Sequence, residues 1–230
     1  MVDDGAEPGA ALIRAVFFDV GETLVDETRQ WTSWAEWLGV TPLTFCAALG
    51  AVIERGEHHR RVFDYFVPGM DLAAEDAKRQ AAGKGYVIES RDLYPDALPT
   101  LVALKAQGLQ VGIAGNQPEQ AEGALLRAGV TADHLASSAR WGIEKPSLRF
   151  FEKIAEIAAL PPSEIAYVGD RLDNDVLPAR EAGLFAVFLV RGPWGVLHAR
   201  RPDAARADLV LNALADLPRA LARANGAPAE

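Results

Sequence analysis

The chain has 230 residues, half of them hydrophobic, which is enough for one packed domain of ordinary size or one domain with a smaller insertion. Its 32 acidic and 23 basic residues give a net charge of −9, which argues against nucleic acid or an anionic membrane as the main partner, and no apolar run approaches the ~18 residues of a membrane span. Because the single cysteine excludes an internal disulfide and the N-terminus has no basic and apolar signal sequence, we expect a soluble, cytoplasmic protein.

The first predicted strand, Ile13–Phe18, is an apolar run without clean alternation, which is typical of strands buried on both faces of a parallel sheet. The run continues directly into Asp19, and a polar turn that contains Gly21 and Glu22 follows. An aspartate after a strand is also a common turn or helix-cap residue, so Asp19 on its own does not indicate a catalytic site.

The next segment, from about Thr28 to Ser90, contains helical patterns and no convincing strand. Thr41 and Pro42 have the order of a helix N-cap and first turn, and Asp71 begins a second helix that ends on glycines. Because open α/β sheets bind ligands at the carboxyl ends of their strands, we expect this insertion to cover that edge. The predicted division is a core domain of residues 1–27 and 91–230 and a small α-helical cap domain of residues 28–90.

Three features of the insertion each have a structural interpretation. Cys46 lies in an apolar pattern and is predicted to be a core residue. His58–Arg61 is interpreted as a solvated face, with Arg60 or Arg61 binding an anionic substrate group as the alternative. Three tryptophans recur every third residue and are predicted to pack along one helical flank, with a substrate pocket or a subunit contact as the alternative: Trp31, Trp34 and Trp37.

The remainder of the chain alternates between helical patterns and apolar runs. Helices are predicted to begin at Pro95, Pro118 and Pro146, and the first of them to end at Gly108. Arg191–Gly195 follows a strand and is predicted to be a turn near the site, without a catalytic role for its tryptophan. This alternation predicts a doubly wound α/β fold with a mainly parallel, Rossmann-like sheet. Its further strands are predicted at Leu109–Ala114, Ile165–Val168, Phe185–Val190 and Asp208–Leu211.

Several residues suited to catalysis follow the predicted strands, at the edge of the sheet where ligands bind. In chain order they are Asp19, Gly115, Asn116, Lys145, Asp170 and Asp175. The lysine lies in "GIEKPS", just before a predicted helix, and the last aspartate is part of the acidic run "GDRLDND". None of these residues is diagnostic alone, but their order and placement together indicate a catalytic site.

In these residues the chain resembles the haloacid dehalogenase superfamily, most of whose members are magnesium-dependent phosphatases. The resemblance covers nearly the whole chain and rests on "FFDVGETLVD", "GIAGN", "EKP" and "GDRLDNDVLPAREAG". It implies that Asp19 is a nucleophile that becomes an aspartyl phosphate, and that Lys145 neutralises the charges of nucleophile and phosphoryl group. It also implies that Asp170 and Asp175 hold Mg²⁺ together with Asp19.

The chemistry that the resemblance implies makes physical sense for these residues. Attack of a carboxylate on a phosphate brings two anions together, which is repulsive unless cations lie between them. A hard divalent ion held by carboxylates and carbonyls, together with one lysine, supplies that positive charge. Backbone N–H groups after Asp19 and at Gly115 and Asn116, with Lys145, are expected to bind the phosphate oxygens.

Two positions depart from the family pattern. The family's first motif has a second aspartate that acts as general acid and base, and this chain has Gly21 there. Its second motif ends in Ser or Thr, where this chain has Gly115. The backbone carbonyl of Gly21 is still expected to bind the metal. A missing general acid or base lowers the rate by about 10²–10⁴-fold, and Gly21→Asp is expected to raise the turnover of alkyl phosphates. Glu22 is a candidate substitute, although a carboxylate that serves the turn is the favoured interpretation.

We therefore expect a hydrolase of the haloacid dehalogenase superfamily that uses Mg²⁺ and acts on a small phosphorylated metabolite through Asp19. It is expected to be slow or selective for good leaving groups, and to be a monomer or homodimer. A catalytically silent binding or scaffold protein is the alternative. A dehalogenase is disfavoured by the acidic residues Asp170 and Asp175, and a phosphonatase-like hydrolase by the late position of Lys78 and Lys84 in the insertion.

Overall fold

A computed structural model describes residues 12–227 of the chain. Its strands form one six-stranded sheet in the order β3-β2-β1-β4-β5-β6, and all neighbouring strands are parallel. This is the doubly wound order of Rossmann-like folds, and it confirms the predicted fold class. The strands are β1 Ala15–Phe18, β2 Gln110–Gly115, β3 His134–Ser137, β4 Ile165–Gly169, β5 Phe185–Leu189 and β6 Leu209–Leu211.

The five strands predicted from apolar runs are all present, and their ends differ from the predicted ones by no more than two residues. The sixth strand, β3, was not predicted. It has four residues, begins with a histidine and ends with a serine, and lies at one edge of the sheet, where it pairs with β2 alone. An edge strand this short needs no continuous apolar run, because only one side of its backbone is paired and its burial is partial.

The three helices expected after prolines are present, and each begins two residues beyond its proline: α4 Ala97–Ala106, α5 Gln120–Arg127 and α7 Leu148–Ala158. Gly108 lies just past α4 with φ of 81°, which confirms the predicted helix stop. The predicted turn at Arg191–Gly195 is wrong, because Gly192 already begins a helix. The other core helices are α6 Ser138–Trp141, α8 Leu177–Glu181, α9 Gly192–His198 and α10 Leu217–Ala224. Short 3₁₀ helices span Ser90–Asp92, Pro162–Glu164, Pro202–Arg206 and Leu214–Asp216, and a π-helical turn spans Leu172–Val176.

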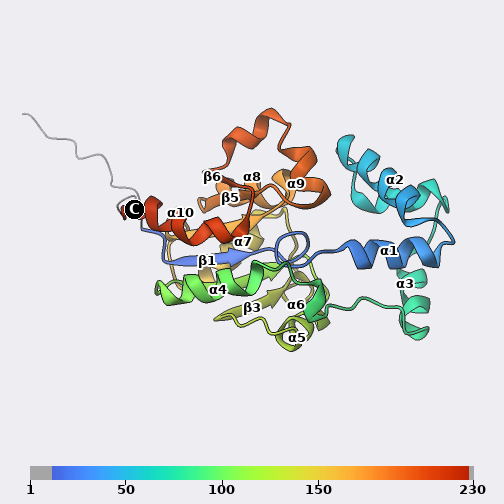
Figure 1. Ribbon diagram of the computed structural model, residues 1–230, viewed down its shortest axis with the longest axis horizontal. Helices are drawn as coiled ribbons and strands as arrows, with labels where there is room; N and C mark the ends of the chain where they lie inside the picture. Colours follow the sequence, from blue (N-terminus) through green and yellow to red (C-terminus); the bar gives the residue numbers. More distant parts are fainter. Residues whose placement is uncertain (1–11, 228–230) are drawn as a thin grey trace, which may run out of the picture.

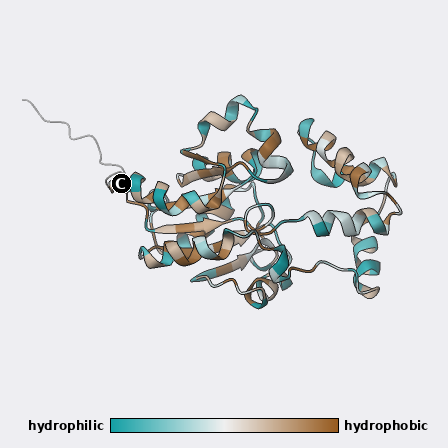
Figure 2. Cartoon of the chain, in the orientation of Figure 1, coloured by the Kyte–Doolittle hydropathy of each residue, from teal (hydrophilic) through white to brown (hydrophobic). Residues whose placement is uncertain are grey.

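Helices cover both faces of the sheet, and the strands alternate between two apolar layers (Figure 1). In β1, Val16 and Phe18 pack on the face covered by α4, α5 and α10, whereas Ala15 and Phe17 pack on the face covered by α7 and α8. Figure 2 shows the hydrophobic colour gathered in the sheet and the hydrophilic colour on the surrounding helices. Burial on both faces explains why the strand sequences lack a polar side.

The segment between β1 and α4 is helical and lies beyond the carboxyl ends of the strands (Figure 1). Thr41 caps its helix as expected, and Asp71 caps the helix that it was expected to begin; each accepts a backbone N–H from the residue three positions later. No single described helix is long and apolar enough to cross a membrane, and the pair α1 and α2 passes such a test only jointly, with a bend of 112°. The segment contains α1 Thr28–Trp37, α2 Pro42–Glu54, the 3₁₀ helix η1 His59–Tyr65 and α3 Leu72–Ala81.

The helical segment has its own apolar cluster, which Trp194 of α9 joins from the core. Helix α2 turns Phe45, Leu49 and Val52 into this cluster. Cys46 is exposed, so its predicted place in the core is wrong. It follows Phe45 directly, and one helical residue rotates the side chain by about 100°, which takes Cys46 off the buried face.

Candidate active site

The site lies where the sheet changes winding direction. Strand β1 pairs with β2 on one side and β4 on the other, and the connections on the two sides run in opposite directions along the sheet. Asp19 directly follows β1 and Asp170 directly follows β4. The backbone N–H of Asp19 donates to the carbonyl of Val168 at 2.9 Å, which fixes the nucleophile candidate against the neighbouring strand. Open α/β sheets bind their ligands at this switch point.

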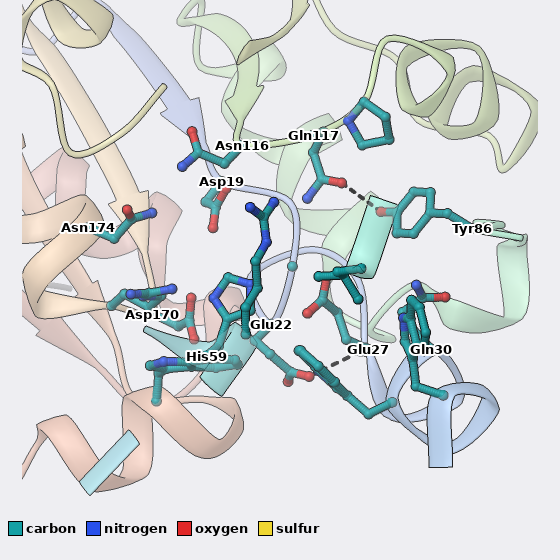
Figure 3. A pocket seen from close by; sticks show the side chains of 18 of the residues that line it. Asp19, Glu22, Glu27, Gln30, His59, Tyr86, Asn116, Gln117, Asp170 and Asn174 are labelled. Carbon is teal, nitrogen blue, oxygen red and sulfur yellow. Dashed lines mark hydrogen bonds between the residues drawn. The ribbon is translucent and has the colours of Figure 1, made fainter. Parts of the chain in front are cut away.

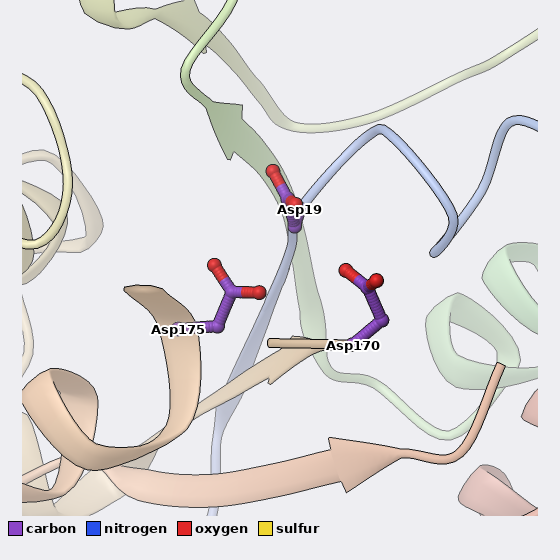
Figure 4. Close-up of side chains that lie close together, drawn as sticks. All are labelled: Asp19, Asp170 and Asp175. Carbon is purple, nitrogen blue, oxygen red and sulfur yellow. The ribbon is translucent and has the colours of Figure 1, made fainter. Parts of the chain in front are cut away.

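Three carboxylates converge there, as Figure 4 shows. Asp19, Asp170 and Asp175 are buried, and each offers an oxygen within 4.8 Å of the others. Gly169 makes this possible, because a Cβ at that position would lie 2.4 Å from the carboxyl carbon of Asp175. Burial raises the pKa of Asp170 well above its usual value, and the carboxylates of Asp175 and Asp19 raise it further. These three buried carboxyl groups therefore need a nearby cation to balance their negative charge.

Lys145 supplies one positive charge to this group. Its buried ammonium nitrogen lies 2.8 Å from Asp19 Oδ1 and 2.6 Å from Asp175 Oδ1. Burial alone would lower the pKa of Lys145, but the two carboxylates raise it well above its ordinary value, so the lysine is charged. Burial raises the pKa of Asp175 to about 6, against the lowering effect of Lys145. We call Asp19, Lys145, Asp170 and Asp175 the carboxylate floor.

The side chain of Asn116 holds the floor lysine in place. Its Oδ1 accepts the backbone N–H of Lys145 at 2.8 Å, and its Nδ2 donates to the carbonyl of Lys145 at 2.8 Å. This reciprocal pair joins the loop after β2 to the loop before α7. Because the amide group is occupied in this way, any phosphate binding by Asn116 falls to its backbone, as the sequence led us to expect.

The two glycines that depart from the family pattern have different surroundings. A Cβ at Gly115 would lie 2.5 Å from Asp19 Oδ1, so a serine or threonine there requires the nucleophile candidate to move. A Cβ at Gly21 would lie 2.6 Å from Oε1 and 2.7 Å from Cδ of Glu27. The place of the missing second aspartate is therefore filled by the carboxyl group of a glutamate from the start of α1.

Glu22, the substitute considered from the sequence, is engaged elsewhere. It is buried with φ of 52°, accepts the hydroxyl of Tyr94 on Oε2 at 2.6 Å, and accepts the backbone N–H of Glu27 on Oε1 at 3.1 Å. Burial raises the pKa of Glu22, and the hydrogen bond from Tyr94 partly offsets this. With both oxygens used, Glu22 is a carboxylate that serves the turn, which agrees with the favoured interpretation.

A cavity of about 290 Å³ opens above the floor. Figure 3 shows the labelled Asp19, Glu27 and His59 around it. Asp19, Asp170 and Asn174 line it from the core, and Arg60 lines it from the insertion. Burial and the carboxylates of Glu22 and Asp19 raise the pKa of Glu27 to about 8. The remaining side is an aromatic wall, by which we mean Trp31, Trp34, His59, Phe63 and Trp194.

The aromatic wall is a close-packed group of rings. The ring centroid of Trp31 lies 6.2 Å from that of Trp194 and 6.0 Å from that of His59, which lies 6.1 Å from Trp194. Burial lowers the pKa of His59 to about 3, helped by the charges of neighbouring groups. His59 is therefore neutral, and its Nδ1 is a buried atom without a hydrogen-bond partner among the described residues.

The sequence analysis found the floor but missed part of the cavity lining. His58, Arg60 and Arg61 are exposed as predicted for a solvated face, whereas His59 faces the cavity. Trp31 and Trp34 line the cavity, in agreement with the pocket alternative, and Trp194 does so from α9. Glu27 was also missed. The signal in the sequence is the absent side chain at position 21, which leaves room that a nearby carboxyl group can fill.

Comparisons with known proteins find a matching family model and several named relatives. A family model described as haloacid dehalogenase-like hydrolase matches residues 13–183. The glyceraldehyde 3-phosphate phosphatase of Pyrococcus furiosus is 30% identical over 95% of this chain and 97% of that protein. The protein of the same name from Methanocaldococcus jannaschii is 34% identical, and its match covers 54% of each chain. A phosphoserine phosphatase of Thermus thermophilus is 33% identical over 60% of this chain and 56% of its own length.

Solved structures show the same fold. A dehalogenase with an intermediate complex superposes with a TM-score of 0.68, at 20% identity, over 92% of this chain and 98% of that one. A phosphatase from Thermococcus onnurineus superposes with a TM-score of 0.59, at 21% identity, over 91% of this chain and 98% of that one. At these identities the superpositions show that the fold is shared. The reaction has to be inferred from the residues of the site.

Proposed function

The chain belongs to the haloacid dehalogenase-like hydrolase family, and from this premise we propose that it hydrolyses a small phosphorylated metabolite with the help of Mg²⁺. The observation that carries the proposal is the contact of one buried ammonium group, Lys145 Nζ, with both Asp19 and Asp175 at the switch point of the sheet. A carboxylate held against a fixed cation in this way is placed to attack another anion.

The floor residues fit a magnesium ion. Asp170 Oδ2 is buried and has no hydrogen-bond partner among the described residues, so it is an acceptor that needs a cation. Carboxylate and carbonyl oxygens are the donors that this hard ion prefers. Asp19, Asp170 and Asp175 would hold it, together with the carbonyl of Gly21. When bound, Mg²⁺ neutralises negative charge on the phosphoryl oxygens.

In the proposed reaction an oxygen of Asp19 attacks phosphorus, the new O–P bond forms, and the bond to the leaving oxygen breaks. Lys145 balances the charge on the attacking carboxylate and on the phosphoryl group. Backbone N–H groups at Gly115 and Asn116 bind the phosphoryl oxygens. Water then cleaves the aspartyl phosphate, which releases inorganic phosphate and restores the carboxylate of Asp19. Both halves of the reaction require a proton to move.

The cavity supports a small organic group beside the phosphate. Its volume of about 290 Å³ suits a metabolite rather than a polymer. The organic part would lie against the aromatic wall, with Arg60 at the edge to meet an anionic or polar substituent. Because the Pyrococcus and Methanocaldococcus relatives are named glyceraldehyde 3-phosphate phosphatases, a triose phosphate is the first substrate to test. We assign the helices of residues 28–90 the role of a cap that selects the substrate.

The test compares the protein with Asp19→Asn in the presence of Mg²⁺. Release of inorganic phosphate is measured with glyceraldehyde 3-phosphate and with an aryl and an acyl phosphate, whose good leaving groups need little proton donation. We expect Asp19→Asn to lose at least about 10³-fold in rate, as for loss of a nucleophile. Equal rates for the two proteins on every substrate would exclude the hydrolase and leave the silent binding protein as the remaining candidate.

A further inference from the structure

The carboxyl group of Glu27 lies beside Gly21, the position where the family pattern has its second aspartate. A Cβ built on Gly21 would lie 2.6 Å from Glu27 Oε1, 2.7 Å from Cδ and 3.2 Å from Oε2. A side chain at position 21 and the carboxyl group of Glu27 therefore cannot both occupy this place. In this chain the glycine leaves that space open, and the carboxyl group of Glu27, the residue just before the first turn of α1, fills it.

We propose that Glu27 is the general acid and base of the hydrolysis, so that its carboxyl group does the work of the aspartate absent at position 21. This inference rests on the proposed function. As Asp19 forms its bond to phosphorus, Glu27 gives its proton to the leaving oxygen, which departs as an alcohol. Glu27, now a carboxylate, takes a proton from water as the water oxygen bonds to phosphorus and the bond to Asp19 breaks. One cycle returns both carboxyl groups to their starting forms.

The surroundings of Glu27 hold it in this place. Its side chain lines the same cavity as that of Asp19, as Figure 3 shows. Its backbone N–H donates to Glu22 Oε1 at 3.1 Å, and Glu22 Oε2 in turn accepts the hydroxyl of Tyr94 at 2.6 Å. Two partly buried hydrogen bonds in series thus fix the start of α1 relative to the core. Glu22 and Tyr94 act as positioning residues.

Other acidic or basic side chains nearby are engaged or differently placed. Asp26, the neighbour of Glu27, accepts the backbone N–H of Thr28 at 2.8 Å and does not line the cavity. His59 lines the cavity but packs in the aromatic wall against Trp31 and Trp194. Glu27 is the carboxyl group whose oxygen meets position 21.

The first experiment is Glu27→Gln, which keeps the shape of the side chain and removes its acid and base function. With an alkyl phosphate we expect the rate to fall by about 10²–10⁴-fold. With an aryl phosphate the leaving group departs unaided, so we expect a burst of one equivalent of phenol followed by slow turnover, because the aspartyl phosphate accumulates. Glu36→Gln, which alters an exposed carboxyl group of the same helix, is the matched control and is expected to behave as the parent protein.

The outcomes separate this inference from the proposed function. If the parent protein shows release that depends on Asp19, and Glu27→Gln matches it on alkyl phosphates without a burst on aryl phosphates, Glu27 is not the acid and base. If the parent protein shows no release that depends on Asp19, the proposed function and this inference fall together. A fall for alkyl phosphates with a burst for aryl phosphates supports both.

The second experiment places a carboxyl group at position 21 and removes the one at position 27. It remains informative if Glu27→Gln fails to fold. Gly21→Asp is introduced into the parent protein and into Glu27→Ala, where the space beside position 21 is open. In the Glu27→Ala background we expect Gly21→Asp to raise alkyl phosphate turnover at least tenfold. In the parent protein we expect a much smaller change, because the new carboxyl group only displaces that of Glu27. This replaces the gain expected from the sequence for Gly21→Asp alone. Equal gains in both backgrounds would show that the two side chains do not share a role.

Discussion

The carboxylate floor and the aromatic wall belong to one cavity, and each has buried polar atoms without a hydrogen-bond partner in the part of the chain that the structure describes. On the floor it is Asp170 Oδ2, an oxygen that needs a cation. On the wall there are two such atoms, Nδ1 of the neutral His59 and Nε1 of Trp31. The floor thus concentrates charge, whereas the wall offers a ligand mainly apolar area with few polar contacts.

The difference also lies in how the two regions are fixed. Two floor residues, Asp19 and Asp170, directly follow the paired strands β1 and β4, and the hydrogen bond from Asp19 to Val168 holds the backbone there. The wall is assembled from α1, η1 and α9, which meet through side-chain packing. We therefore expect substitutions in the wall to change ligand binding and to leave the chemical step unchanged, since they do not move the strand ends. The following predictions test that division, beginning with the largest effect.

Lys145→Met tests the floor most severely. It leaves Asp19 and Asp175 buried without the ammonium that lies between them. We expect turnover to fall by about 10²–10³-fold and the free energy of unfolding to fall by roughly 3–5 kcal/mol. Phosphate release and urea unfolding measure the two effects. Lys153→Met removes an exposed ion pair and is expected to change neither appreciably. A Lys145→Met protein as active as the parent would mean that the floor needs no fixed cation.

Gly115→Ser tests whether the floor has room for the hydroxyl that the family pattern places there. Its Cβ would lie 2.5 Å from Asp19 Oδ1, so the carboxyl group of Asp19 must rotate away. We expect kcat to fall by about tenfold or more, as for small misplacements of reacting groups. Gly50→Ser, on α2 with no atom near its Cβ, is the control. A gain in kcat for Gly115→Ser would show that the rotated Asp19 is the productive form.

Trp31→Phe tests the wall. The indole packs against the rings of Trp194 and His59 in the aromatic wall, so a smaller ring there is expected to weaken binding without changing the chemical step. We expect KM to rise by about 2–10-fold, corresponding to roughly 0.5–1.5 kcal/mol, with kcat unchanged. Trp141→Phe, which removes an indole packed on Phe150, controls for a general loss of stability. A fall in kcat at constant KM would contradict the division between wall and floor.

The smallest effect concerns stability and pH. His59 has its pKa lowered from 6.5 to about 3, so it stabilises the folded protein fully above pH 6.5 and progressively less as the pH falls towards 3. We expect His59→Gln to reduce the slope of unfolding free energy against pH in this range by up to about 1.4 kcal/mol per pH unit. Urea unfolding at several pH values measures it, with the exposed His58→Gln expected to change the slope less. An unaltered slope would mean that His59 is solvated.

Sequence patterns predicted most of the fold and of the floor, for a physical reason. Strands buried on both faces must be apolar along their whole length, and parallel strands bring the residues after them to one edge, so that Asp19 and Asp170 could be placed together. The edge strand β3 was not predicted, because it is only partly buried and so lacks a continuous apolar run. Glu27 and His59 were not predicted as cavity residues, because their positions depend on how α1 and η1 pack on the core. No local periodicity in the sequence indicates that packing.

The contact between Trp31 of α1 and Trp194 of α9, with ring centroids 6.2 Å apart, gives the molecule an optical reporter. Indole emission responds to the polarity of its surroundings, and these two rings come from different parts of the fold, one from the helical insertion and one from the core. Any displacement of α1 from α9 during a catalytic cycle would expose both to water together. Stopped-flow fluorescence can therefore time substrate entry and phosphate departure on the unlabelled chain, with no dye added and no residue replaced.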